Sequence, residues 1–223
     1  MDFAAPDAAD FANVRALNKA FLRLARDGQL ARPCLRGLES PLTKRLCSLT
    51  ELQVERLSET PFLLFSLRER DVRYWDQLLA LPRNRDLFAT PPAVTDGYSR
   101  LTSAGLGFVW QLANRNPFAA RVIAGASLYW CERISERTIF NLLAVAGTRN
   151  DLLVLRTASD ADLWKKLLDR GVVRQDIIRR SAQMAALHTV LTCDRSDQRQ
   201  VWPSAARRMD KPRLQVAEES GET

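Results

Sequence analysis

The chain has 223 residues, with 33 Lys or Arg against 26 Asp or Glu and a net charge of +7. Its content of 46% hydrophobic and 26% charged residues is that of a globular protein with a real core. No apolar run reaches the ~20 residues that span a bilayer, and the acidic start (Met1 to Asp7) lacks a secretory signal, so we expect a cytoplasmic protein without membrane contact.

Arginine carries most of the basic charge, because only five of the basic residues are Lys. Guanidinium groups pair with phosphate in a bidentate fork, so this excess favours an acidic partner such as nucleic acid. A solvated surface is the alternative interpretation.

The first predicted element is a helix that ends before Gly28. Its apolar residues recur at three- and four-residue steps and form a narrow stripe, which is typical of a helix–helix contact. The helix packs either on the rest of the chain or on a second copy. The candidate dimer contacts are therefore Phe11, Val14, Leu17, Phe21 and Leu24. A loop with Pro33, Gly37 and Pro41 is expected to follow.

A second helix is predicted from Thr50, where Thr50 and Gln53 have the spacing of a capping box. It stops before Pro61, since a residue that precedes proline avoids helical dihedrals. The run Phe62–Phe65 fits a buried helical turn or a strand, and helix character resumes over 72–79.

Residues 82–95, with Pro91 and Pro92, form the best internal boundary. Beyond it we predict helical segments and no β-pattern. The segments cover 99–113, 118–133, 135–146, 151–155, 159–169 (opened by a capping box at Ser159) and 174–191. The fold class is therefore all-α, with an N-terminal helical segment of dimerisation type and a C-terminal multi-helix bundle. The predicted regions are 1–81, a linker at 82–98, the bundle at 99–192 and a disordered tail at 193–223.

Few residues suit catalysis or metal binding. His188 is the single histidine and lies in an apolar context, and no nucleophile motif accompanies it. The cysteines have no C-x-x-C spacing, so neither a zinc site nor a disulfide framework is indicated. Gly105 and Gly107 form a G-x-G without a third glycine, which favours helix packing over a nucleotide loop. We expect no catalytic residues, no metal and no cofactor, and do not expect an enzyme.

Two helices joined at Gly171 match the outline of a helix-turn-helix. Arg and Gln side chains read guanine and adenine edges in the major groove, and further arginines can hold phosphates. A basic amphipathic helix without DNA contact is the alternative. The candidate DNA-binding residues are Arg174, Gln175, Arg179, Arg180 and Gln183.

Two motifs lie in the first third of the chain. Asn18–Ala25 carries N-x-x-[aromatic]-L-x-L-A, Leu46–Thr60 carries L-x-x-L-T-x-x-Q-x-x-x-L-x-E-T, and an apolar run leads to Arg68. With these motifs, residues 11–75 resemble FlhD, a subunit of the bacterial flagellar transcriptional activator. This sequence has a shorter loop between the motifs and Phe65 where the family has a cysteine. The resemblance implies a helical protein that dimerises and acts on promoter DNA with a zinc-bearing partner subunit, FlhC.

Two functions follow from the sequence. The first is a bacterial transcriptional regulator that binds promoter DNA as a homo-oligomer, with or without an FlhC-like partner. The alternative is a helical adaptor that binds another protein and no nucleic acid.

Overall fold

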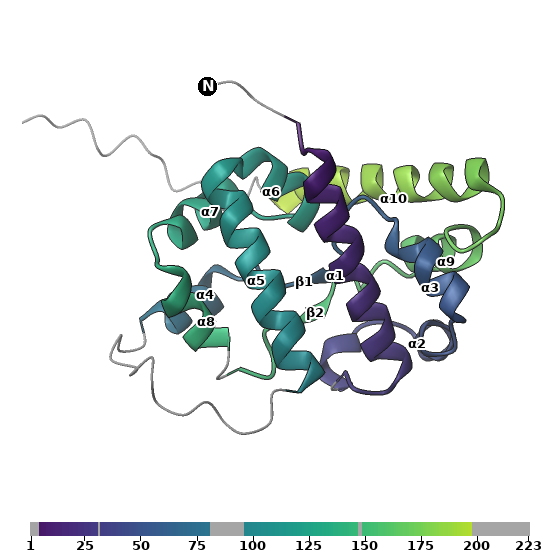
Figure 1. Ribbon diagram of the computed structural model, residues 1–223, viewed down its shortest axis with the longest axis horizontal. Coiled ribbons are helices and arrows are strands. Elements are labelled where there is room, and N and C mark those ends of the chain that lie inside the picture. The colour runs from purple at the N-terminus through teal and green to yellow at the C-terminus, as the bar shows by residue number, and fades with distance from the viewer. Residues whose placement is uncertain (1–4, 31, 81–95, 147–148, 198–223) are drawn as a thin grey trace, which may run out of the picture.

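The computed structural model describes residues 5–30, 32–80, 96–146 and 149–197 (Figure 1). It confirms the all-α prediction, since helices make up most of the described chain. The described strands form a single two-stranded ribbon. The helices are α1 (Ala8–Arg26), α2 (Ser40–Cys47), α3 (Glu51–Ser58), α4 (Val72–Leu79), α5 (Gly97–Arg115), α6 (Pro117–Ala124), α7 (Leu128–Ser135), α8 (Ile139–Ala146), α9 (Ala161–Arg170) and α10 (Asp176–Asp197). A short 3-10 helix (Arg32–Leu35) precedes α2, and the strands are β1 (Phe65–Ser66) and β2 (Val154–Leu155).

Helix α1 lies at the centre of the fold, between α3 and α5 (Figure 1). Asp7 caps it by accepting from the Asp10 backbone N–H at 2.8 Å, while Asp10 accepts from Asp7 N–H at 3.0 Å. Midway along α1 the buried Asn18 donates to Phe62 O and accepts from Leu64 N–H, both at 2.9 Å. These bonds satisfy backbone groups that burial would otherwise leave unpaired, and they fix the segment before β1 against α1.

The antiparallel ribbon corrects two predictions. The sequence indicates no β-pattern and a helical segment over 151–155, whereas β2 pairs with β1 and places Leu155 opposite Phe65. The ambiguous run Phe62–Phe65 thus ends in a strand. Each strand has only two residues, which is too short for an alternating pattern to be recognised in the sequence.

Helix α5 packs beside α1 and against the ribbon (Figure 1). A Cβ atom on Gly105 would lie 3.1 Å from the Phe65 ring, so glycine permits the close approach. Gly105 thus serves helix packing as predicted, whereas a Cβ atom on Gly107 would meet only Ile139 Cδ1, at 3.9 Å. Phe65 also contacts Phe21 of α1, with ring centroids 5.5 Å apart, so one aromatic side chain joins the two long helices.

Three further helix predictions need correction. The expected loop around Pro41 contains α2, because proline is tolerated in the first turn of a helix, and Pro41 occupies that position. The predicted helix over 118–133 is two helices, since Gly125 ends α6 with a φ of +75°. Asp160 rather than Ser159 caps α9, accepting from Leu163 N–H at 2.9 Å.

A buried arginine fixes the end of α6 to the ribbon. Arg156 follows β2, is 4% exposed and donates from Nη1 to Ile123 O at 2.6 Å. Burial lowers its pKa to about 10. A Cβ atom on Gly125 would lie 2.6 Å from Arg156 Nη2, so glycine is required there for space as well as for its positive φ.

The core is continuous across the regions predicted as 1–81 and 99–192, since buried residues from Val14 to Val190 form one cluster. Most of the predicted linker at 82–98 lies outside the described residues, although Gly97 and Tyr98 already belong to α5. Helix α10 continues through 193–197, where the tail was predicted to begin, and the rest of the predicted tail lies outside the described residues. Among the helices described here, none combines the length and apolarity needed to cross a membrane.

Candidate nucleic-acid interface

The predicted helix-turn-helix consists of α9, a connection over 171–175, and α10, which pack against each other. Leu163, Trp164, Leu167 and Leu168 form the buried face of α9. The Gly171 backbone N–H donates to Leu167 O at 2.9 Å and ends the helix. The connection is longer than the three to four residues typical of the DNA-binding motif.

Two of the five candidate DNA-binding residues face the protein interior. Gln183 is 3% exposed and donates to Arg56 O at 3.0 Å. The Arg179 side chain is 12% exposed, and its Nε lies 3.0 Å from Oε2 of Glu59, the residue that follows α3. Arg179 also pairs with Asp176 in the first turn of α10. Both residues hold α10 against α3, so they are not available to DNA in this conformation.

The other three candidates lie together at the N-terminal end of α10. Arg174 and Gln175 are exposed, and the Arg180 side chain is 75% exposed. Arg180 Nε lies 2.9 Å from Asp176 Oδ2, and this carboxylate offsets the positive charge that Arg180 would present to a ligand. Among the arginines of the five candidate DNA-binding residues, Arg174 is therefore the one that keeps an exposed charge without an ion pair in the described chain.

Four exposed cations lie on α9 and on the connection that follows it, and we call this group the basic corner: Lys165, Lys166, Arg170 and Arg174. Within the described ranges, none of them has an acid at ion-pair distance. Two neighbouring acids have other partners, because Asp169 pairs with Arg45 of α2 and Asp176 with Arg179. A third acid, Asp162, is exposed one turn earlier on α9, near Lys165 and Lys166, and forms no ion pair with either. Sequence reasoning missed three members of this group, since only the tertiary pairing shows which charges remain uncompensated.

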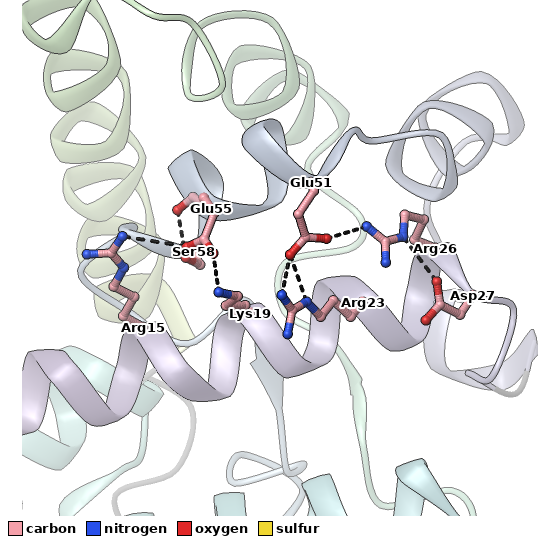
Figure 2. A network of polar contacts seen from close by, with 8 residues as sticks. All are labelled: Arg15, Lys19, Arg23, Arg26, Asp27, Glu51, Glu55 and Ser58. Atoms are coloured by element: carbon pink, nitrogen blue, oxygen red, sulfur yellow. Dashed lines mark hydrogen bonds and ion pairs between the residues drawn. The ribbon is translucent and has the colours of Figure 1, made fainter.

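The cations of α1 are compensated instead, as Figure 2 shows. Arg23 and Arg26 both pair with Glu51 of α3, while Arg15 and Lys19 both pair with Glu55. Hydrogen bonds from Arg23 and then Arg26 lower the pKa of Glu51 to about 2. The hydrogen bond from Lys19 also lowers the pKa of Glu55. Arg15 also pairs with Glu59, and Arg26 with Asp27, so each of the four cations on this face has at least one acid partner.

The candidate dimer contacts of α1 lie mostly inside the same chain. Val14, Leu17 and Phe21 are buried in the shared core, and Leu24 is half-buried against it. Phe11 is 40% exposed at the start of the helix. The narrow stripe thus contacts α3 and α5 in this structure, and a second copy could reach only its first turn without rearrangement.

Two open grooves flank the start of α9. One, of about 260 Å³, lies against α10 and is lined by Asp160, Lys166 and Thr189 among others. The other, of about 350 Å³, lies against α2, with Leu42 and Lys165 in its wall. In the part of the chain that the structure describes, no three His, Cys, Asp or Glu side chains gather as a metal site would need.

No protein-family model, curated protein or solved structure matches this chain. The resemblance to FlhD therefore stays a prediction that depends on the two motifs.

Proposed function

We propose that this protein is a DNA-binding transcriptional regulator whose basic corner contacts the phosphates of the duplex. The observation that carries the proposal is that Lys165, Lys166, Arg170 and Arg174 are exposed and uncompensated among the described residues, whereas α1 has its cations matched by α3. Uncompensated Lys and Arg supply the counterion release that drives binding to DNA.

The start of α10 adds a means of reading bases. In helix-turn-helix proteins the N-terminal residues of the second helix contact base edges in the major groove. Gln175 and Arg180 are exposed at this position, next to Arg174 of the basic corner. Gln suits adenine and Arg suits guanine. The resemblance of residues 11–75 to FlhD supports the same function, and it implies promoter DNA and an FlhC-like partner as the finer details.

The test compares two double variants that remove the same charge. R170A/R174A removes two cations of the basic corner. R73A/R100A removes two arginines that are also exposed and have no acid partner in the described chain, on α4 and α5. Fluorescence anisotropy with duplex DNA at several salt concentrations gives the slope of log affinity against log salt.

We expect the corner variant to lower that slope by about 1.8, because each lost phosphate contact removes about 0.9. The α4/α5 variant should leave it near the wild-type value. Equal slopes for the two variants would place the DNA contact elsewhere. A flat salt response of the wild type, together with nuclease-resistant capture of a protein, would favour the adaptor function instead.

A further inference from the structure

Helix α10 exposes an uncharged face on the side opposite α3, and we call it the α10 strip. Ile177 is 82% and Met184 55% exposed, and the polar members of the face are exposed as well. Leu191, at its far end, is half-buried. The strip consists of Ile177, Ser181, Met184, Ala185, His188, Leu191 and Thr192.

The central residues of the strip follow the spacing of a helix pair. Ile177, Ser181, Met184, His188 and Leu191 are separated by steps of four, three, four and three residues. This repeat of 3.5 residues keeps one side of a helix facing a partner helix over several turns. It differs from the inward face of α10, where Ala182, Ala186 and Val190 pack against the core.

The absence of charge on the strip favours a second copy of this chain as its partner. The chain carries +7, so two copies repel each other wherever their basic surfaces meet. The strip contains no Asp, Glu, Lys or Arg, and Arg180 and Asp176 at its border compensate each other at 2.9 Å. A highly charged partner would find no opposite charge there, whereas a second copy would meet no like charge.

We propose that the α10 strip is a self-association surface on which two copies pair through antiparallel α10 helices. A twofold axis at Met184 brings Ile177 of one copy opposite Leu191 of the other, and Met184 opposite Met184. Ser181 then lies within about one residue of His188 in the other copy, where a hydroxyl and an imidazole can hydrogen-bond. Apolar residues meet apolar ones, and polar residues meet polar ones.

The size of the strip sets the strength of the contact. From Ile177 to Thr192 the helix rises by about 22 Å, which at a helix width of about 10 Å offers roughly 220 Å² per copy. A stable dimer buries about 800 Å² per copy. The dimer should therefore be weak. This inference does not depend on DNA binding.

Sedimentation equilibrium of the full chain without DNA tests the proposal, over about 5 to 500 µM. The wild type should shift reversibly from monomer to dimer. Met184→Glu should raise the dissociation constant more than about tenfold, because two carboxylates would face each other across the axis. Leu52→Glu is the matched control, since Leu52 is 67% exposed on α3, and it should leave the constant unchanged.

A charge pair tests the antiparallel direction. Ile177→Lys and Leu191→Glu should each weaken the dimer, while the double variant I177K/L191E should restore it, since the axis brings Lys opposite Glu. Circular dichroism checks that each variant is folded. A wild type that stays monomeric at all concentrations, or a dimer that Met184→Glu leaves intact, would overturn the proposal. Loss of DNA binding alone leaves this experiment unaffected.

Discussion

The α1–α3 face and the basic corner both carry several cations, yet they differ in what surrounds them. On the α1–α3 face, Glu51 and Glu55 each accept two cations. At the corner, Asp169 and Asp176 are already paired with Arg45 and Arg179, and the nearby Asp162 forms no ion pair with the exposed cations. The comparison teaches that the pairing of charges, rather than their number, decides which surface attracts a polyanion.

The largest effect is expected from Phe21→Ala, which tests the apolar contact of α1 with the ribbon, next to the α1–α3 face. Phe21 is fully buried and contacts Phe65, so truncation should lower the free energy of unfolding by about 3–5 kcal/mol. Urea unfolding followed by circular dichroism measures it. Ile177→Ala, at an exposed position, should change stability by no more than about 0.5 kcal/mol. A stable Phe21→Ala protein that no longer dimerises would instead support the predicted α1 dimer contact.

The next largest loss of stability is expected at Arg179, because this side chain links the start of α10 to the end of α3. Arg179→Met breaks the pair with Glu59 in a mostly buried setting, and should cost about 1.5–2 kcal/mol. Arg180→Met is the control, because Arg180 pairs with the same Asp176 while 75% exposed, and it should cost less than about 0.5 kcal/mol. Urea midpoints compare them. Equal losses would show that Arg179 does not hold α10 to α3.

A smaller effect is expected from acid. Because the folded-state pKa of Glu51 is about 2, below the usual value near 4.3, its ion pairs add stability at neutral pH. That contribution should disappear as the pH falls from about 5 to 2. Urea midpoints across this range should decline less steeply in Glu51→Gln than in the wild type. An identical decline in both proteins would mean that other carboxylates dominate acid unfolding.

The smallest effect on stability is expected at the corner itself. Arg170→Ala and Arg174→Ala remove cations without acid partners in the described chain, so each should change the free energy of unfolding by less than about 0.5 kcal/mol. Thermal melts at low salt give the value. A large loss at either position would mean that its cation stabilises the fold and is not reserved for a ligand.

Local signals in the sequence predicted much of the helical structure. Thr50 and Gln53 form the predicted capping box, with both reciprocal hydrogen bonds present. The helix over 72–79 has the predicted bounds. These features depend on neighbours within one or two turns, which is why they can be recognised from the sequence alone.

Features that depend on distant residues could not be predicted. The pairing of Phe65 with Leu155 joins strands of two residues each, and nothing near either strand indicates the other. At the candidate site, the orientation of α10 was the difficulty. The sequence does not show which face of α10 turns inward, because Arg179 and Gln183 suggest a ligand until the packing of α3 shows their partners.

The β1–β2 pairing also constrains how the protein is made. The ribosome adds about 90 further residues between Phe65 and its partner Leu155. At about 5–20 residues per second this takes roughly 5–18 s. During that time the apolar run Phe62–Phe65 has none of its contacts with β2. Until β2 emerges, the nascent chain can hold this run only through elements made earlier, chiefly Asn18 and Phe21 of α1.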